Sequence, residues 1–243
     1  MSANLPDFKT GVVRPMDCLR GGWDLIKDQY WLFLGISFVA IFIGGAVPLG
    51  ILMGPMLCGL YLALFRKQSG QPVTFDLLFK GFDFFGDSLI ATLIQMIPMM
   101  VVMVPGYLIM VGTMLTTMQP GRRGEPPDMV PFFAVFGGFF VLIMLTSLIV
   151  GSFFAFTYPL IVDRRLSGIN AVKTSIKAAL GNLGGVFGLM FLNMVLGVVG
   201  VLFCYVGAFL FMPIGFAAWS IAYRQVFGTV DAAMNTPPAP PVF

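Results

Sequence analysis

The sequence has no histidine, little charge and only three cysteines, and each shortage excludes a class of function. Of its 243 residues, 10% are charged and 58% are hydrophobic, whereas roughly 25% of the residues in an ordinary soluble domain are charged. This composition excludes a soluble globular protein and predicts an integral membrane protein. The cysteines form no C-x-x-C motif and have no histidine to complete a metal site, so we expect structural thiols and no cofactor.

Charged residues are missing altogether from four long stretches, which cover residues 29–65, 88–121, 129–162 and 178–223. A transmembrane helix needs about 20 predominantly apolar residues to cross a hydrocarbon core of roughly 30 Å. With turns placed at the Gly and Pro clusters, the stretches predict six spans, at residues 31–47, 49–65, 89–111, 132–162, 184–204 and 206–223. Pro98 and Pro105 are expected to bend the third span. The fourth is long enough to tilt or to break at Gly137 and Gly138.

The Lys and Arg residues predict the orientation of these spans. Twelve of the 14 lie on one side of the six-span topology, and the exceptions, Arg122 and Arg123, lie in the external loop at residues 112–131. Loops on the cytoplasmic side carry an excess of Lys and Arg, so we expect both termini to be cytoplasmic. The polar start of the chain lacks the features of a cleaved secretory signal, and the first span is therefore expected to stay in the mature protein.

A short amphipathic segment precedes each pair of spans, at residues 15–28, 74–87 and 169–182. The sequence DCLRGGWDLIKD (17–28) aligns without gaps on DLLFKGFDFFGD (76–87). Apolar residues recur at helical spacing in both, and they include Leu19, Trp23, Ile26, Phe75, Phe79 and Phe82. The pattern predicts three helices lying along the cytoplasmic surface of the membrane.

Three outgoing spans end in the same way, with Arg and then Gly four residues later: RKQSG (66–70), RRLSG (164–168) and RQVFG (224–228). We expect each Arg to complement the negative helix end and the headgroup phosphates, and each Gly to provide a left-handed helix end. The outgoing segments GPMLCGLYLALFRKQSG (54–70) and MPIGFAAWSIAYRQVFG (212–228) also align.

The sequence therefore predicts an all-α polytopic membrane protein with a threefold internal repeat of an interfacial helix and a hairpin. The predicted hairpin units are residues 15–70, 71–168 and 169–228. A cytoplasmic segment, residues 1–14, precedes them, and a Pro-rich tail, residues 229–243, follows and is expected to be disordered.

The segments GWDLIKDQYWLFLGISFVAIFIGG, GPMLCGLYLALFRKQSG, FDLLFKGFDFFGD and TYPLIVDRRLSG together resemble a bacterial family. This family comprises YciC-like six-helix membrane proteins and the membrane domain attached to some glycerophosphodiester phosphodiesterases. The resemblance covers roughly residues 15–228 and implies a multi-pass protein of the bacterial inner membrane. No activity transfers with it, because the phosphodiesterase chemistry belongs to a separate soluble domain for which this chain has no room.

Three groups of residues are candidates for interactions. Those expected at the lipid headgroups are Arg66, Arg164, Arg224, Lys173, Lys177 and Trp23. Those expected at helix contacts, inside the molecule or between copies, are Gly50, Gly54, Gly181, Gly185 and Gly188. An external partner is expected to meet the loop residues Arg122, Arg123 and Glu125.

We expect no catalytic activity, because general acid–base catalysis would have only Asp76, Asp83, Asp87 and Asp163 to draw on. Two function classes remain. One is a structural or accessory subunit that assembles with itself, with anionic lipid or with other membrane proteins; nucleic acid is not an expected partner. The alternative is a permease or channel for an apolar or lipid-like molecule, because Gly- and Pro-rich helices can line a cavity.

The short first hairpin either spans the bilayer or enters and leaves on the cytoplasmic side, where it would help to bend the membrane.

Overall fold

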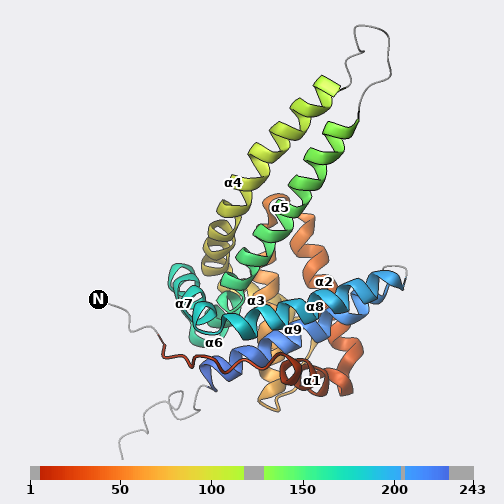
Figure 1. The fold of residues 1–243 in the computed structure, drawn as a ribbon. Coiled ribbons are helices and arrows are strands. Elements are labelled where there is room, and N and C mark those ends of the chain that lie inside the picture. Colours follow the sequence, from red (N-terminus) through yellow and green to blue (C-terminus); the bar gives the residue numbers. More distant parts are fainter. Residues whose placement is uncertain (1–5, 118–128, 204–205, 230–243) are drawn as a thin grey trace, which may run out of the picture. The chain divides into compact units, whose positions relative to one another are not determined.

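The computed structural model describes residues 6–117, 129–203 and 206–229 (Figure 1). Within these ranges the regular structure is entirely helical. The α-helices are α1 (Pro15–Ile26), α2 (Tyr30–Ala46), α3 (Met53–Gln68), α4 (Phe85–Thr117), α5 (Val130–Phe154), α6 (Thr157–Arg164), α7 (Gly168–Gly181), α8 (Leu183–Leu202) and α9 (Val206–Phe227). Three 3₁₀ helices accompany them: η1 (Lys27–Gln29), η2 (Pro48–Gly50) and η3 (Phe75–Phe84).

Four helical stretches of the described chain are long and apolar enough to cross a membrane, judged by length and composition: Pro15–Ala46, Phe75–Thr117, Val130–Arg164 and Leu183–Leu202. The helices α3 and α9, which cover the second and sixth predicted spans, are outside this set. The structure thus supports an all-α protein built for a membrane, while the prediction of six spans in three repeated hairpins stays a prediction.

The chain forms two compact units, a larger one from residues 1–92 and 153–243 and a smaller one from residues 93–152. The smaller unit consists of the later part of α4 and nearly all of α5, whose apolar side chains are largely exposed. A helix that is apolar on all sides and yet exposed is typical of contact with lipid. Both helices are continuous: α4 runs through its two prolines and α5 through its paired glycines, so the predicted break at Gly137 and Gly138 is wrong.

The helix α4 is also longer than predicted, because the external loop was expected to begin at residue 112. Instead α4 reaches Thr117. The hydroxyls of Thr113, Thr116 and Thr117 donate to backbone carbonyls three or four residues earlier, at 2.8 to 3.1 Å. These hydroxyls find their hydrogen-bond partners within the helix, so α4 continues through the three threonines.

The fourth predicted span, 132–162, is divided in the structure between α5 and α6. At the break between these helices, a side chain from α7 provides hydrogen-bond partners for the backbone. The Ser175 hydroxyl donates to the Phe153 carbonyl (2.7 Å) and accepts from the Phe156 amide (3.1 Å). Because Ser175 is fully buried and lies 19 or more residues away in sequence, the local pattern gave no indication of this break.

Each of the three predicted surface helices packs on another helix of the larger unit: α1 on α9, η3 on α3 and α7 on α6. Glycines make the first two contacts close. A Cβ on Gly22 would lie 2.7 Å from the backbone nitrogen of Ala218, and one on Gly81 would collide with the carbonyl of Pro55 and the backbone of Gly59. Substitution at either glycine would therefore push two backbones apart.

The first two surface helices bury residues other than most of those on the apolar face that was predicted to lie along the membrane. In η3 the buried residues include Leu78, Gly81 and Phe84, three apart, because a 3₁₀ helix has three residues per turn. The predicted apolar face of this segment instead points outward, with Phe79 46% exposed. In α1 the buried residues are Cys18, Gly22 and Ile26, while Trp23 is 45% exposed. Mostly small and aliphatic residues thus meet the protein, together with Phe84, while Trp23 and Phe79 face away from it.

The N-terminal segment, residues 7–14, is extended and packs on the larger unit. Two backbone hydrogen bonds hold its middle, since the Lys9 amide donates to the Val226 carbonyl (2.9 Å) and the Gly11 amide to the Gly181 carbonyl (3.0 Å). The buried Asn182 side chain joins the same segment, because it accepts from the Val12 amide and donates to the Lys9 carbonyl. The start of the chain is thereby part of the fold.

Candidate functional site

The C-terminal ends of α3, α6 and α9 meet at Asp163, which is the centre of the most polar cluster of the larger unit. Its carboxylate accepts a hydrogen bond from the Tyr223 hydroxyl (2.8 Å) and lies 2.9 Å from Nη1 of Arg224. Nε of Arg164 lies 3.3 Å from Oδ2 of Asp163, the oxygen that accepts from Tyr223, and this ion pair lacks hydrogen-bond geometry. The Asp163 side chain is only 8% exposed, so its charge depends on these partners for stabilisation.

Arg224 connects the three helix ends. Its Nε donates to Oε1 of Gln68 at the end of α3 (3.0 Å), and the Gln68 amide in turn donates to Ser220 of α9 (2.9 Å). The guanidinium also lies over the ring of Phe65, 4.3 Å from its centroid. A cation over an aromatic face and in contact with a carboxylate is fixed in orientation as well as in position. We call Asp163, Arg164, Tyr223, Arg224 and Gln68 the Asp163 cluster.

Arg164 completes the cluster by reaching the end of α9, where its Nη2 donates to the Phe227 carbonyl (2.8 Å). Helix C-termini leave carbonyls unsatisfied and carry partial negative charge. Here Arg164 and Arg224 satisfy such carbonyls, at Phe227 and Gly228. Two of the three arginines predicted at lipid headgroups therefore have partners inside the protein, and the prediction that they bind headgroups stays a prediction.

A cleft opens beside the cluster. It has a volume of about 440 Å³, within the roughly 300–1,000 Å³ typical of small-molecule sites. Its lining combines apolar residues with polar and charged ones; the lining residues are Leu62, Phe65, Val162, Gln68, Ser69, Asp163, Arg165, Arg224 and Thr229. We call this the helix-end cleft. Because the lining includes two arginines and one aspartate, it favours a ligand with negative charge.

The three Arg-x-x-x-Gly endings are not alike in the structure. Gly70 and Gly228 have φ of 68° and 69°, as the predicted left-handed helix ends require. Gly168 does not: it begins α7, its amide donates to Asp87 (3.0 Å), and a Cβ there would collide with the Asp87 carbonyl. The left-handed residue of this ending is Arg165, with φ of 51°. An L-residue pays on the order of 1 kcal/mol for that conformation.

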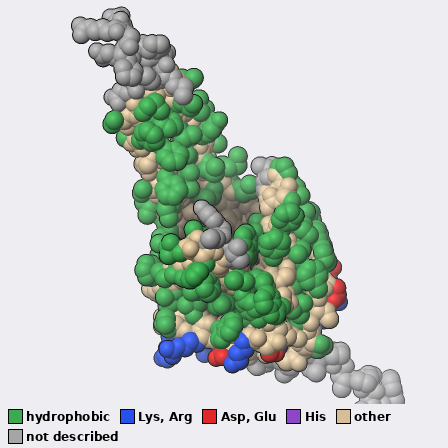
Figure 2. All heavy atoms as spheres, turned by 90° about the vertical axis from the view of Figure 1, so that its right-hand side faces the viewer, with side chains coloured by type: hydrophobic (Ala, Val, Ile, Leu, Met, Phe, Trp, Pro, Cys, Tyr) green, Lys and Arg blue, Asp and Glu red, His purple; other side chains and the backbone are tan. Residues whose placement is uncertain are grey.

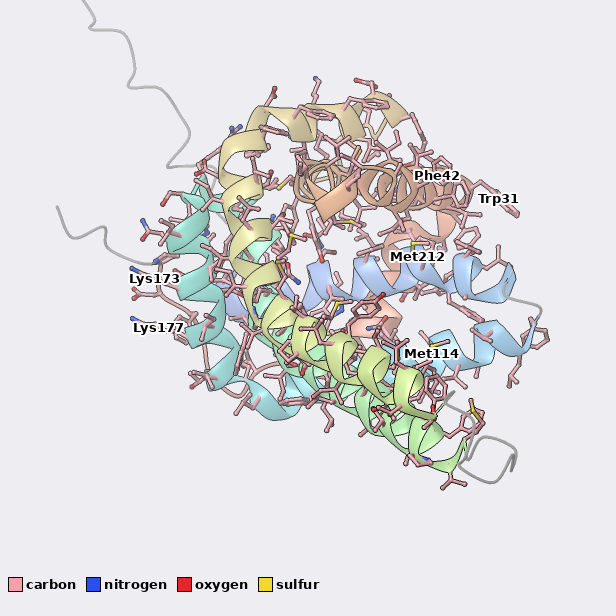
Figure 3. All side chains as sticks on the ribbon, turned by 90° about the horizontal axis from the view of Figure 1, so that it is seen from above. Trp31, Phe42, Met114, Lys173, Lys177 and Met212 are labelled. Carbon is pink, nitrogen blue, oxygen red and sulfur yellow. The ribbon has the colours of Figure 1, made fainter. Side chains whose placement is uncertain are left out.

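The other predicted headgroup residues lie at different places on the larger unit. Lys173 and Lys177 are exposed on the outer side of α7 and point away from it (Figure 3). Arg66 is half-buried at the end of α3, and Trp23 is exposed with its ring edge against Tyr30. Figure 2 shows Lys and Arg side chains gathered at one end of the larger unit, on a face that is otherwise mostly hydrophobic. This segregation suits a protein that has one end at a headgroup layer.

Four of the five predicted contact glycines lie at close contacts inside the molecule. Gly54 faces the start of α4, where a Cβ would lie 2.7 Å from the Ser88 carbonyl. Gly181, Gly185 and Gly188 form the surface on which the N-terminal segment packs, and Cβ atoms there would come within 2.8 Å of that segment. Gly50 instead takes a φ of 58° at the hairpin tip.

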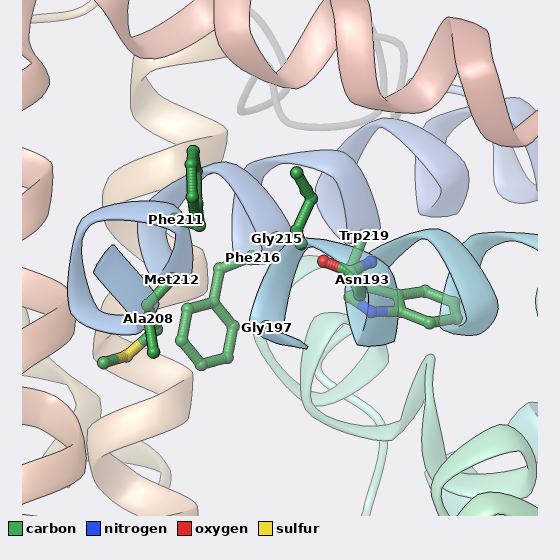
Figure 4. Close-up of a pocket in the computed structure, with 9 residues that line it drawn as sticks. Asn193, Gly197, Ala208, Phe211, Met212, Gly215, Phe216 and Trp219 are labelled. Carbon is green, nitrogen blue, oxygen red and sulfur yellow. The ribbon is translucent and has the colours of Figure 1, made fainter. Parts of the chain in front are cut away.

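A second, smaller pocket of about 240 Å³ lies between α8 and α9 (Figure 4). Its walls are mainly apolar and include Phe211, Phe216 and Trp219. The polar side chain in it is Asn193, whose amide donates to the Leu189 carbonyl and whose oxygen faces Gly215. This pocket provides a single hydrogen-bond acceptor in apolar surroundings.

The external loop residues Arg122, Arg123 and Glu125 lie outside the described part of the chain, as do Cys204 and the tail from residue 230. In the described part, the His, Cys, Asp and Glu side chains form no group of three that could hold a metal ion. Asp76 and Asp83, two of the acids weighed as catalytic, are exposed on η3.

Comparison with known proteins identifies no relative: no family model, no curated protein and no solved structure matches this chain. The resemblance to the YciC-like proteins accordingly stays a prediction.

Sequence reasoning did not assign the Asp163 cluster a role. The available signal was the DRR triplet at 163–165, which places an acid beside two arginines at the end of an apolar helix. Its partners Gln68 and Tyr223 gave no signal in the sequence, because they lie 60 or more residues from Asp163 along the chain and only folding brings them to it.

Proposed function

We propose that the chain is a non-enzymatic, multi-pass protein of the bacterial inner membrane, which acts as a structural or accessory subunit through assembly with lipid, with itself or with other membrane proteins. In this proposal it has six spans in three hairpins, and both termini are cytoplasmic. Two observations carry it: the packing of each predicted surface helix on another helix, α1 on α9, η3 on α3 and α7 on α6, and the gathering of Lys and Arg side chains at one end of the larger unit.

The pairing of surface helices with outgoing helices supports an internal repeat. Gly22 and Gly81 occupy equivalent positions in the aligned surface segments, and Ala217 and Gly59 occupy equivalent positions in the aligned outgoing segments. Gly22 meets Ala217 and Ala218, while Gly81 meets Gly59. The same contact between the same aligned positions is what a duplicated unit would produce. Because α1 packs on the last outgoing helix, the three units would close on one another.

The outward-facing side chains of the surface helices support membrane contact. Trp23 on α1 and Phe75, Phe79 and Phe82 on η3 are exposed, and Lys173 and Lys177 are exposed on α7. Aromatic residues favour the interfacial region of a bilayer, and each Lys near an anionic surface contributes on the order of 1 kcal/mol. These helices would thus lie in the cytoplasmic headgroup layer, with the apolar helices inserted from it.

Native mass spectrometry of the tagged protein, released gently from its own membrane, tests the assembly role. A fixed complex with other proteins or a defined ring of this chain is the expected result. A lone monomer that carries one specific small molecule would contradict it.

The first hairpin is short enough to be shallow. With 17 and 16 residues, α2 and α3 extend only about 25 Å each at 1.5 Å per residue, less than a hydrocarbon core of roughly 30 Å. The alternative to six full spans is therefore a first hairpin that enters and leaves on the cytoplasmic side. A cysteine placed at Ala46 should then resist a membrane-impermeant thiol reagent added outside the cell, and rapid labelling there would refute the shallow arrangement.

The alternative function, a permease for an apolar or lipid-like molecule, is favoured by one observation, the pocket between α8 and α9. A ligand with one donor group on an apolar body would suit Asn193 and the surrounding aromatic side chains. Under this alternative, an Asn193→Leu variant would lose transport while its thermal stability stayed close to that of the parent protein.

A further inference from the structure

Arg165, which lines the helix-end cleft, is the residue at which the three Arg-x-x-x-Gly endings differ in backbone conformation. The other two hairpins place glycine, Gly70 and Gly228, at the left-handed position that follows the outgoing helix. The middle hairpin places an arginine there, although glycine would occupy the conformation without strain. Strain that persists at a cleft is a reason to look for function.

The strained backbone positions the Arg165 side chain at the cleft. Its guanidinium lies over the ring of Phe84, 4.4 Å from the centroid, and Arg165 is among the residues that line the cleft. Within the described chain no carboxylate or carbonyl accepts a hydrogen bond from it, in contrast to Arg164 and Arg224, which are held by Asp163 and by the end of α9. Arg165 thus brings hydrogen-bond donors, fixed over an aromatic ring, that the fold leaves unused.

The other residues that line the cleft indicate what kind of ligand could accept hydrogen bonds from Arg165. Asp163 is already paired with two arginines, so its carboxylate does not cancel the charge of Arg165. Three apolar side chains, Leu62, Phe65 and Val162, also line the cleft, and we call them the apolar wall. A guanidinium binds phosphate or carboxylate through two parallel hydrogen bonds, and the apolar wall accommodates a hydrocarbon portion of the same ligand.

We infer that the helix-end cleft binds the phosphate group of a small ester, with Arg165 as its principal ligand and the apolar wall against the esterified portion. The phosphate would belong either to a phospholipid headgroup or to a soluble phosphate ester. The lipid source rests on the proposed membrane function, whereas the soluble source does not. Phosphate is favoured over carboxylate because the lining contains two arginines, Arg165 and Arg224, and a phosphate monoester carries more negative charge than a carboxylate.

The test uses the purified full-length chain in uncharged detergent and two probes. The first probe is dioleoyl-phosphatidylglycerol, with bound copies counted by native mass spectrometry. The second is radiolabelled glycerol 3-phosphate, measured by equilibrium dialysis. The decisive variant is Arg165→Gly, which removes the guanidinium and at the same time supplies the residue best suited to the left-handed backbone. We therefore expect this variant to fold, and its thermal midpoint should stay within about 3 °C of the parent.

The expected result is one retained copy of a probe that Arg165→Gly binds at least tenfold more weakly. Retention of the lipid with no binding of glycerol 3-phosphate identifies a headgroup, and the reverse identifies a soluble ester. The matched control is Lys9→Gln, which removes one exposed charge in the N-terminal segment, away from the lining of the cleft, and should leave this binding unchanged.

Three results would overturn the inference: no binding of either probe, unchanged binding by Arg165→Gly, or equal losses in Arg165→Gly and Lys9→Gln, since equal losses would mean that only net charge matters. Oleate bound as tightly as the phosphate probes would overturn the choice of phosphate. None of these results bears on the assembly role, which is decided by the complexes recovered from the membrane.

Discussion

Replacing Asp163 by alanine should separate the ends of α3, α6 and α9 more than any other single change of a charged residue in the larger unit. The substitution removes the carboxylate that Arg164, Arg224 and the Tyr223 hydroxyl share. It leaves two arginine side chains that are only 21% and 17% exposed without their counter-charge. Breaking a buried pair in this way costs about 3–5 kcal/mol, because one charge stays buried and uncompensated.

The partial exposure of the two arginines argues for the lower end of that range, since water screens part of their charge. We therefore expect a loss of about 3 kcal/mol. For a chain of this length each kcal/mol lowers the thermal midpoint by roughly 2–4 °C, so the midpoint should fall by about 6–12 °C. Tyr223→Phe, which removes only the hydrogen bond to the carboxylate, should cost about 1.5–3 kcal/mol.

The assay is the thermal midpoint of the purified protein in mild detergent, followed as the loss of the monodisperse peak in size-exclusion chromatography. The matched control is Asp24→Ala, which breaks the exposed Lys27–Asp24 pair on the surface of α1. Exposed pairs contribute about 0.2–1 kcal/mol, so this control should change the midpoint little. An equal, small shift in both variants would refute the view that Asp163 holds the helix ends together.

Close backbone contacts give two further predictions. Gly81→Ala should lower the thermal midpoint strongly, because its Cβ would collide with the backbone of α3, whereas Gly86→Ala, which meets nothing within 4 Å, should leave it unchanged or raise it; equal effects would contradict the described packing of η3. Gly185→Ala should release the N-terminal segment and speed tryptic cleavage after Lys9, because its Cβ would come within 2.5 Å of Val13, and the neighbouring Gly184→Ala should not. Slow cleavage in both variants would show that the segment is held elsewhere.

Several elements could be predicted from sequence because their signals are local. The helix α7 occupies residues 168–181, against a predicted 169–182, since apolar periodicity and a preceding Ser and Gly mark its start. The left-handed glycines at 70 and 228 were likewise readable, because glycine at a helix end has a direct steric reason. These features depend on neighbours a few residues away.

The errors occurred where a distant residue decided the local structure. Gly168 has the same spacing as the other two glycines, yet its close approach to Asp87 commits it to the start of α7 and moves the left-handed conformation to Arg165. Residues 75–84 align with an α-helical segment but form a 3₁₀ helix whose buried face follows a three-residue period. In both cases the structure differs from what the spacing of neighbouring residues in the sequence predicts.

The sequence by itself determined that the chain is helical and apolar enough for a membrane, and that its cations gather toward one end, because hydrophobicity and charge are properties of each residue that folding does not alter. Only the tertiary structure decided that Asp163 pairs with arginines and a tyrosine from two helices, and that Arg165 has donors beside a cleft which no group in the described residues accepts. The physical reason is that a buried charge is stabilised by whichever groups the fold brings within hydrogen-bond distance, and those groups lie far apart in the chain.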